Sequence, residues 1–370
     1  MPDEKFIDAA YRIFEEVNPD NNLFVLVSDG NEFLQYIKNT PITRVTKQEF
    51  LSTDFIKTLR LYDMVVLHYL DNLKIQLLAR SHNSVNFVWL GWGADYYDLI
   101  TGDTRKLLKP LTYELFKKQY VRKSIRVIKR IIKKLFLEHV SKSQVINKIR
   151  FFAPVLFEDY LLVKKTIPHF RPKYISWNYG TLEDDMIRGF EDYSVSDDNI
   201  LIGNSATYPN NHLDTFELLK NLQLSGRKIF CPLSYGDSVL KKNIIKIGHK
   251  IYGENFFPIK NFLPSEEYIN LISSCSVVIM NHLRQQALGN IVIMIYLGAK
   301  VFLDEQNPVY CFFKKQGTFV FSMDDLSSEY TTRLDIKSIK HNRNILSKHW
   351  SREVILSKTH KLIETIKDDK

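Results

Sequence analysis

The feature that most constrains the fold is the alternation of short apolar runs with segments of helix length. In the first half, runs rich in Val and Leu occupy residues 22–29, 63–70 and 85–93. Helical stretches such as residues 48–61 lie between them. Strands separated by helices predict a parallel sheet with helices on both faces.

The alternation returns in the second half, after an acidic connection at residues 182–199. NILIGNSATYPNNHLDTFELLKNL is typical of a strand, a polar loop and a helix, and RKIFCPLSYGD of a strand and a loop. RQQALGNIVIMIYLGAKVFLDEQNP is typical of a loop, a helix and a further strand. We therefore expect an α/β protein with two Rossmann-like domains that face each other across a cleft, as in many nucleotide-sugar transferases. The predicted boundaries are 1–181, a linker at 182–199, a second domain at 200–345, and a C-terminal helix at 346–370 that packs back on the first domain.

Composition narrows the class of protein. A chain of 370 residues suits two domains, and 45% hydrophobic with 25% charged residues is typical of a globular protein. Cys231, Cys275 and Cys311 are odd in number and widely spaced, which argues against a disulfide framework or a zinc site. The N-terminus has no signal-peptide pattern, and no apolar run reaches the roughly 18 residues of a membrane span.

The net charge of +9 is concentrated in one segment. Residues 101–150 hold 15 Lys and Arg against 3 Asp and Glu, so the rest of the chain is slightly acidic. Within the basic segment, residues 105–150, apolar residues at 128, 131, 132 and 135 follow helical spacing with basic residues between them. Two interpretations remain open: a solvated helix face, or a helix lying on an anionic membrane surface. Nucleic acid is not expected as a partner, because no zinc-finger spacing or RNA-binding signature is present.

Ligands of such sheets bind beyond the carboxyl ends of the strands. In LIGNSATYPNN, Gly203 would let the backbone approach a ligand, while Asn204 and Ser205 offer hydrogen-bond donors. An ordinary strand-to-helix turn, capped by Asn211 or Asp214, explains the stretch equally well.

Two further loops of the second half suggest a nucleotide diphosphate. In NHLRQQALGN, Arg284, Gln285 and Gln286 directly precede a helix, whose N-terminus is suited to a pyrophosphate. The loop CPLSYGDS places Tyr235 after a strand, where it would contact a nucleobase. A surface arginine and a simple turn are the alternatives.

The stretch FVWLGWGADYYDLITG ends a buried strand in a loop with a carboxylate at its tip. Asp95 on this loop would take the proton of an attacking sugar hydroxyl, and Trp92 would stack on a sugar ring. The alternative is that Asp95 caps the next helix and Trp92 lies in the core. His68, at the end of another strand, is the second candidate for the base.

Several other enzyme classes are disfavoured. The chain has no Asp-x-Asp motif, and the nearest approach, Glu183-Asp184-Asp185, lies in the predicted linker. It has neither a His-Glu-x-x-His nor a Gly-x-Ser-x-Gly motif, and no Walker loop. We therefore expect no bound metal and no other cofactor.

The motifs WGADYYDL, LIGNS, RQQALGN and DEQNP, in this order and spacing, resemble those of the family 56 glycosyltransferases. These are the TDP-N-acetylfucosamine:lipid II N-acetylfucosaminyltransferases of enterobacterial common antigen synthesis. The resemblance runs over roughly residues 63–308 and is weak in the N-terminal sixty residues and the C-terminal tail.

The resemblance implies a metal-independent GT-B transferase in which the first domain presents the acceptor and the second binds the nucleotide-sugar. The donor would be a dTDP-activated 6-deoxyhexose and the acceptor a saccharide on undecaprenyl pyrophosphate, at the cytoplasmic face of the bacterial inner membrane. Asp95 and His68 would be catalytic, and the acceptor would contact Trp92, Gly93 and Tyr96. The donor would contact Gly203, Asn204, Ser205, Tyr235, Arg284, Gln285, Gln286, Gly289 and Asn290.

The sequence also departs from the family. The basic block from residue 117 to 150 is longer and more charged than expected, and CPLSYGD matches only loosely. O-antigen or capsule assembly and a GDP-fucose donor therefore stay open. A non-catalytic saccharide-binding protein and a basic nucleic-acid-binding protein are the rivals from other classes.

Overall fold

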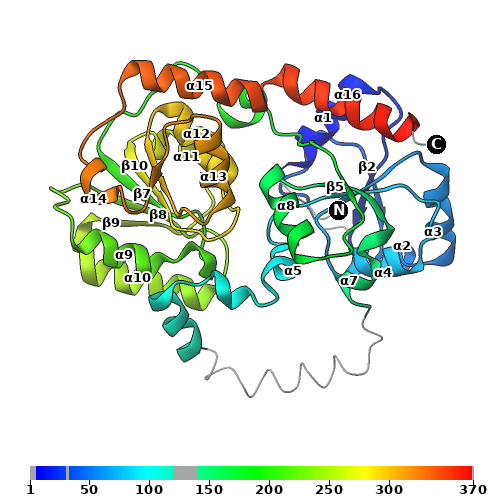
Figure 1. The fold of residues 1–370 in the computed structure, drawn as a ribbon, viewed down its shortest axis with the longest axis horizontal. Helices are drawn as coiled ribbons and strands as arrows, with labels where there is room; N and C mark the ends of the chain where they lie inside the picture. The colour runs from blue at the N-terminus through cyan, green and yellow to red at the C-terminus, as the bar shows by residue number, and fades with distance from the viewer. Residues whose placement is uncertain (1–5, 31–32, 120–139, 369–370) are drawn as a thin grey trace. The chain divides into compact units, whose positions relative to one another are not determined.

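The computed structural model describes residues 6–30, 33–119 and 140–368. The chain forms two compact units (Figure 1). Unit 1 comprises Met1–Gly102, Lys134–Arg188 and Lys348–Lys370, and unit 2 comprises Asp103–Lys133 and Gly189–Ser347. This division differs from the predicted boundaries, because described residues 103–119 go with unit 2 and residues 182–188 with unit 1.

Unit 1 contains a four-stranded parallel sheet in the order β3-β4-β5-β6. Its strands are β3 (Val65–His68), β4 (Phe87–Leu90), β5 (Ile149–Ala153) and β6 (Lys173–Tyr174). The register pairs His68 with Leu90 and Leu90 with Ala153, so these three residues end their strands at the same edge. The sheet therefore has one carboxyl edge at which the following loops meet.

The run at 22–29 also forms a strand, β1 (Phe24–Val27), but it does not join this sheet. It pairs with β2 (Ile42–Val45), which we did not predict, in a separate two-stranded parallel sheet. Unit 1 also contains several short helices: α2 (Lys47–Phe50), α3 (Thr53–Thr58), α4 (Asn72–Arg80), α5 (Tyr97–Thr101) and α7 (Lys142–Val145).

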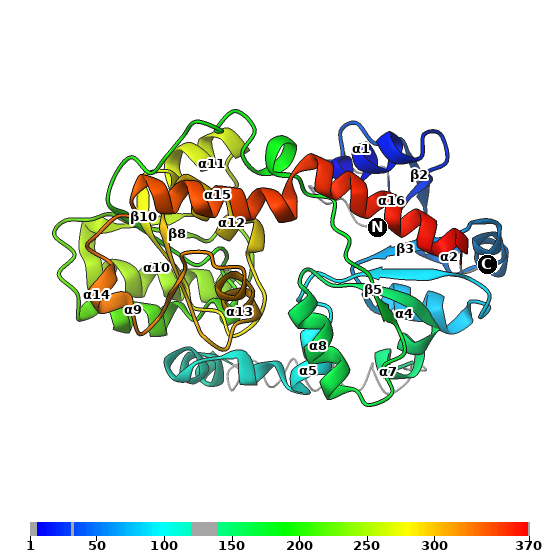
Figure 2. The same ribbon diagram turned by 45° about the horizontal axis from the view of Figure 1, so that its top comes forward.

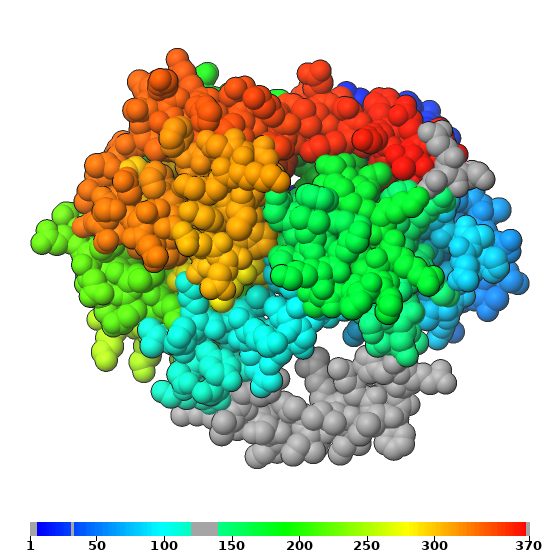
Figure 3. All heavy atoms as spheres, in the orientation of Figure 1, coloured from blue at the N-terminus to red at the C-terminus, as the bar shows by residue number. Residues whose placement is uncertain are grey.

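Helices cover both faces of the unit 1 sheet (Figure 2). On one face, α1 (Ile7–Val17) and α16 (Arg352–Asp368) bury a cluster with alternate strand residues; it includes Ala9, Ala10, Phe14, Val88, Leu90, Phe151, Ala153, Leu362 and Ile366. On the other face, Trp89 stacks on Phe152, which also contacts Tyr160 of α8 (Phe157–Thr166). The outer side of α8 forms part of the surface drawn in green in Figure 3.

Unit 2 contains a six-stranded parallel sheet in the order β12-β11-β10-β7-β8-β9. The strands are β7 (Asn199–Ile202), β8 (Ile229–Pro232), β9 (Phe256–Ile259), β10 (Cys275–Met280), β11 (Lys300–Leu303) and β12 (Phe321–Ser322). The helices are α9 (His212–Lys220), α10 (Ser238–Tyr252), α11 (Ser265–Ile272), α12 (Leu288–Leu297), α13 (Pro308–Lys315), α14 (Leu326–Glu329) and α15 (Ile336–Trp350), which runs on into unit 1.

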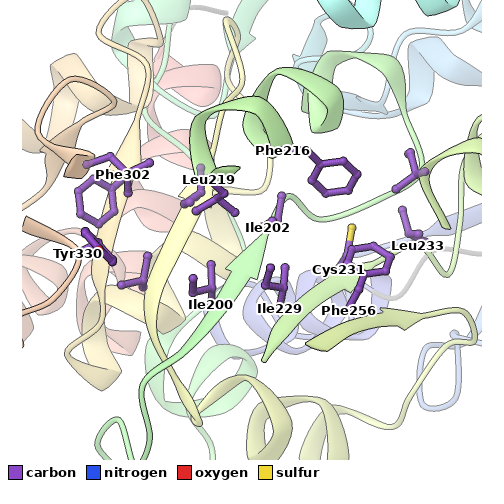
Figure 4. Packing of buried hydrophobic residues seen from close by; sticks show 14 of the residues in the cluster. Ile200, Ile202, Phe216, Leu219, Ile229, Cys231, Leu233, Phe256, Phe302 and Tyr330 are labelled. Carbon is purple, nitrogen blue, oxygen red and sulfur yellow. The ribbon is translucent and has the colours of Figure 1, made fainter. Parts of the chain in front are cut away.

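The core of unit 2 follows from strands that are mostly apolar. β7 and β10 are completely buried, as expected of central strands covered on both faces. Figure 4 shows Ile200 and Ile202 of β7 in one buried cluster with Phe216 of α9 and Phe256 of β9. This packing holds the central strands rigidly, so the loops at their ends start from defined positions.

Residues 103–119 attach to unit 2 through side chains near its strand ends. The carboxylate of Asp214 accepts hydrogen bonds from the backbone nitrogens of Leu111 (2.9 Å) and Thr112 (3.0 Å), at the start of a helix over residues 110–119. Lys109 forms a largely buried ion pair with Asp304 (2.6 Å). Asp214 thus caps a helix that we had not expected it to cap. Residues 120–139, the middle of the basic amphipathic stretch that we predicted, lie outside the described residues.

Candidate functional site

The loops after β7 and β10 start at the topological switch point of unit 2. The chain leaves β7 to form β8 and β9 on one side, and then returns to form β10 and β11 on the other side. Connections that diverge in this way open a crevice beyond the carboxyl ends of β7 and β10, where ligands of open α/β sheets bind. The predicted donor residues Gly203–Ser205 and Arg284–Gln286 follow these two strands.

Side-chain amides join the two loops. Gln286 Nε2 donates to Asn204 Oδ1 at 2.8 Å, and Asn204 Nδ2 donates to the hydroxyl of Tyr235 at 2.8 Å. Burial raises the pKa of Tyr235, against the lowering effect of Ser205, Asn204 and the charge of Arg284. The residue Tyr235 is nevertheless 56% exposed. Three predicted donor residues therefore meet in one hydrogen-bonded chain, with an accessible aromatic ring at its end.

A buried layer beneath these loops explains why Gly203 is a glycine. Its φ is +61°, and a Cβ there would lie 2.7 Å from Asn210 Oδ1. Asn210 Oδ1 accepts a hydrogen bond from the backbone nitrogen of Asn204 (2.9 Å), and it lies within hydrogen-bond distance of His282 Nε2 (2.9 Å). Burial lowers the pKa of His282 well below its usual value, so this imidazole is neutral. Neutral, polar groups thus shape the backbone that carries Asn204.

The N-terminus of α12 lies directly after Gln286. Ala287 precedes the helix in a left-handed conformation, and no side chain caps the first turn. Arg284 Nη1 donates to the carbonyl of Gln285 at 2.9 Å, Gly289 is exposed, and Asn290 Nδ2 donates to the Tyr268 hydroxyl at 3.3 Å. An uncapped helix start beside a guanidinium is electropositive and can hold a diphosphate.

In unit 1 the carboxylate of Asp95 points into the protein. Asp95 is 2% exposed, and its oxygens accept hydrogen bonds from the backbone nitrogens of Leu70 (2.9 Å) and Trp92 (2.7 Å) and from Trp89 Nε1 (2.7 Å). Burial raises its pKa, against the lowering effect of these three bonds. The carboxylate therefore ties the loop after β4 to the end of β3, and its role as a base stays a prediction.

His68 and Trp92 lie next to each other at this edge. Their rings are 4.8 Å apart in an edge-to-face arrangement, and His68 Nε2 is 2.8 Å from the hydroxyl of Tyr179. Burial lowers the pKa of His68 to about 3, so the imidazole is neutral. Within the described residues, His68 Nδ1 and Trp92 Nε1 are buried without a hydrogen-bond partner. Two ring nitrogens therefore remain for a polar ligand.

The other predicted acceptor residues are interior. Gly93 is buried with φ at +83°, which only glycine adopts readily. Tyr96 is completely buried, and its hydroxyl donates to Asp159 at 2.8 Å. The neighbouring Tyr97 donates to the other oxygen of Asp159 at 2.7 Å. These tyrosines anchor the WGADYY loop to α8, while Trp92 is the predicted acceptor residue that stays partly exposed.

Sequence reasoning missed Tyr179, Asp159 and Asn210, which hold the predicted residues in place. Tyr179 is 111 residues from His68, and Asp159 is 63 residues from Tyr96, so no local pattern links them.

Within the described ranges, no group of three or more His, Cys, Asp or Glu side chains is arranged to hold a metal ion. No helix in the part of the chain that the structure describes is long and apolar enough to cross a membrane.

A family model matches the second half of the chain. Residues 180–348 match "4-alpha-L-fucosyltransferase glycosyl transferase group 56". This range contains the predicted donor residues from Gly203 to Asn290, and it confirms the resemblance to that family.

Solved structures of low identity share the fold over nearly the whole chain. A glycosyltransferase from Rickettsia africae has a TM-score of 0.61 at 10% identity, with 99% of this chain and 96% of that chain covered. HepE of Anabaena, solved in complex with UDP and glucose, has a TM-score of 0.59 at 11% identity and coverages of 97% and 95%. Sucrose-phosphate synthase from Thermosynechococcus elongatus has a TM-score of 0.60 at 8% identity and coverages of 94% and 89%.

The chain spans 59% of the length of a further match, the pneumococcal O-GlcNAc transferase GtfA, at a TM-score of 0.50 and 12% identity. Together these structures confirm the predicted fold class, two Rossmann-like domains of the GT-B type.

Proposed function

We propose that this chain, whose residues 180–348 match the fucosyltransferase group 56, is a glycosyltransferase that transfers a 6-deoxyhexose, fucose-like or N-acetylfucosamine-like, from a nucleotide donor. We propose a dTDP-linked donor and a polyprenyl-pyrophosphate-linked saccharide as acceptor. The product would enter a surface polysaccharide such as enterobacterial common antigen, O-antigen or capsule. The reaction would take place at the cytoplasmic face of the inner membrane, with the protein attached peripherally.

The observation that carries the proposal is the convergence at the switch point of unit 2. Asn204, Gln286 and Tyr235 come from three strand-end loops and are joined by hydrogen bonds of 2.8 Å each. Arg284 and the uncapped start of α12 lie on the same stretch of chain. Hydrogen-bonding amides, an accessible aromatic ring and an electropositive helix start match a sugar, a base and a diphosphate. HepE, which shares the fold, binds UDP and glucose.

In the proposed reaction, an acceptor hydroxyl oxygen attacks the anomeric carbon of the donor sugar. The bond from that carbon to the diphosphate oxygen breaks, and the nucleoside diphosphate leaves with the electron pair. Arg284 and the amides of the first turn of α12 would stabilise the charge that develops on the leaving group. We expect no metal, because these groups supply the positive charge.

The hydroxyl proton requires an acceptor, for which Asp95 and His68 are the two candidates. We favour His68, because its Nδ1 has no hydrogen-bond partner among the described residues. Asp95 stays the alternative, since its carboxylate already accepts three hydrogen bonds and would need its loop to open. In the favoured scheme Asp95 positions the loop that carries Trp92.

The first experiment is a calorimetric and thermal-shift panel of dTDP, UDP, GDP and their deoxysugars. It uses wild-type protein, Arg284→Ala, and Arg333→Ala as a control for losing one guanidinium, since Arg333 pairs with Asp198 on the surface. We expect one nucleotide class to raise Tm in wild type and the control but not in Arg284→Ala. A Tm shift with GDP alone would indicate a GDP-linked donor in place of the dTDP-linked one. No Tm shift and no binding with any of the nucleotides would contradict the transferase proposal.

A turnover assay then separates an enzyme from a saccharide-binding protein. The selected donor is mixed with polyprenyl-pyrophosphate saccharides, and release of nucleoside diphosphate is followed. Binding of the donor with no release in the presence of any acceptor would favour a non-catalytic binding protein.

A further inference from the structure

A second hydrogen bond joins the same two loops as the bond between Gln286 and Asn204. His282 lies two residues after the end of β10, and Asn210 lies in the loop after β7. Both side chains are completely buried, and His282 Nε2 is 2.9 Å from Asn210 Oδ1. The two loops are therefore joined twice, once between predicted donor residues and once between residues that no solvent reaches.

The position of the proton in this second bond follows from the neighbouring groups. The backbone nitrogen of Asn204 can only donate, so the Asn210 atom that lies 2.9 Å from it is the side-chain oxygen. Asn210 Nδ2 in turn donates to the hydroxyl of Thr207 at 2.8 Å. Because an amide oxygen only accepts, His282 Nε2 is the donor of the bond to Asn210.

The surroundings of His282 favour this tautomer over the other protonation states. Burial lowers the pKa of His282, so the ring carries one proton, and that proton is on Nε2. Nδ1 is buried without a hydrogen-bond partner in the described part of the chain. A proton on Nδ1 would be a buried, unpaired donor, and a ring protonated there alone would set the lone pair of Nε2 against the oxygen of Asn210.

The main chain of His282 is held in place as well as its ring. Its backbone nitrogen donates to the carbonyl of Met280 at 2.8 Å, and its carbonyl accepts a hydrogen bond from Asn307 Nδ2 at 3.0 Å. Asn307 is itself completely buried, and its Oδ1 accepts from the backbone nitrogen of Val309 at 2.9 Å, at the start of α13. The imidazole therefore projects from a fixed backbone and can hold Asn210 in one orientation.

Asn210 passes this constraint on to Asn204. The backbone nitrogen of Asn204 donates to Asn210, and its side chain bonds both Gln286 and Tyr235. Groups that bind a ligand are held in a productive geometry by hydrogen bonds from the residues behind them. Resting on the proposed function, in which the side-chain amide of Asn204 meets the donor sugar, we propose that His282 is a positioning residue of the donor site. Its Nε2–H group holds Asn204 in place through Asn210.

Three variants of the full-length protein test this role. His282→Leu removes the donor and leaves an apolar side chain of similar size, whereas His282→Gln keeps an N–H donor at a similar reach. His212→Leu is the matched control, because His212 is also buried and its Nε2 has no hydrogen-bond partner among the described residues. Circular dichroism and urea unfolding check that each variant folds.

The first measurement needs no ligand. Proton–nitrogen correlation spectra of the histidine rings should show a protonated Nε2 and an unprotonated Nδ1 for His282, whose signals are those that His282→Gln lacks. Hydrogen exchange of the Asn204 amide should accelerate about tenfold in His282→Leu. The amide of Gly203 donates to the carbonyl of Ile279 at 2.9 Å and should keep its exchange rate. A general loss of stability would accelerate both amides.

Calorimetry with the nucleotide-sugar and with its nucleotide then tests the donor site. We expect His282→Leu to weaken binding of the nucleotide-sugar by about tenfold and binding of the nucleotide by less, because Asn204 is assigned to the sugar. His282→Gln and His212→Leu should bind both ligands like the wild type.

An unprotonated Nε2 of His282 in the wild type would overturn the proposal. Unchanged exchange of the Asn204 amide, or unchanged affinity for the nucleotide-sugar, in His282→Leu would also overturn it. Equal losses of affinity in His282→Leu and His212→Leu would contradict it too, since they would report the loss of any buried imidazole.

Two further outcomes are separated by the design. If the wild type binds no nucleotide, the proposed function fails and with it the role in a donor site, whereas exchange of the Asn204 amide still shows whether His282 positions that residue. If His282→Leu does not fold, His282→Asn takes its place, because its shorter side chain ends near the position of Nδ1 and lacks a donor at Nε2.

Discussion

The side-chain amide of Gln286 donates a hydrogen bond to the side-chain carbonyl of Asn204 at 2.8 Å. Both residues are more than nine-tenths buried, and they join the loop after β10 to the loop after β7. This bond uses Nε2 of Gln286. The other polar atom of the side-chain amide, Oε1, is buried and has no hydrogen-bond partner among the described residues. The pair therefore fixes the crevice and leaves one acceptor for a hydroxyl or amide proton of a ligand.

Replacing Gln286 by Glu should weaken binding of the nucleotide-sugar by about tenfold or more. A carboxylate cannot donate to Asn204 Oδ1, and its charge would repel the diphosphate. Calorimetry with the nucleotide and the nucleotide-sugar measures the effect. Gln286→Met is the neutral control. If Oε1 accepts a hydrogen bond from the sugar, Gln286→Met should weaken nucleotide-sugar binding more than nucleotide binding. Unchanged affinities for both ligands in both variants would exclude Gln286 from the site.

Gly203→Ala should destabilise unit 2 more than Gly226→Ala. Both glycines have positive φ, +61° and +75°, which costs an alanine about 1–2 kcal/mol. Only at Gly203 would the new Cβ also meet Asn210 Oδ1, at 2.7 Å, for roughly 1–3 kcal/mol more. Urea unfolding followed by circular dichroism gives the difference. Equal losses for the two variants would show that Asn210 moves aside freely.

His68 should make the stability of unit 1 depend on pH. Its folded pKa of about 3 lies below the ordinary value of 6.5, so the unfolded chain binds more protons between these values. Stability is therefore retained above pH 6.5 and falls as the pH drops towards 3, by about 1 kcal/mol between pH 6.5 and 5.5. All four tryptophans lie in unit 1, so their fluorescence reports its unfolding. His68→Gln should lack this part of the pH dependence; an identical slope in both proteins would contradict burial of a neutral imidazole.

Asp95→Asn should destabilise unit 1 by about 2–4 kcal/mol. The amide group would face the three donors that the carboxylate now satisfies, from Leu70, Trp89 and Trp92. Unfolding followed by fluorescence and turnover measured with the identified substrates separate the two roles. Wild-type stability combined with lost turnover would support Asp95 as the base instead of His68.

The candidate donor site was largely predictable from local sequence. Gly203, Asn204, Arg284 and Gln286 each follow an apolar run, and the ends of parallel strands meet at one edge of a sheet. Strand order was not predictable, because the pairing of β7 with β10 joins residues about 75 positions apart. The same limit applies to Tyr235, whose bond to Asn204 depends on how its loop folds back.

Periodicity and loop chemistry in the sequence determine that this protein has two α/β units, each with polar loops at the ends of its strands. They do so because strand and helix patterns repeat over a few residues and are read locally. Tertiary structure decides which polar groups face a ligand. Asp95, at the tip of a glycine-rich loop, is turned inward by donors from β4, its own loop and the chain after β3. Residues 103–119 join unit 2 because Asp214 and Asp304 hold them there. Such pairings depend on distant segments, so only the folded chain sets them.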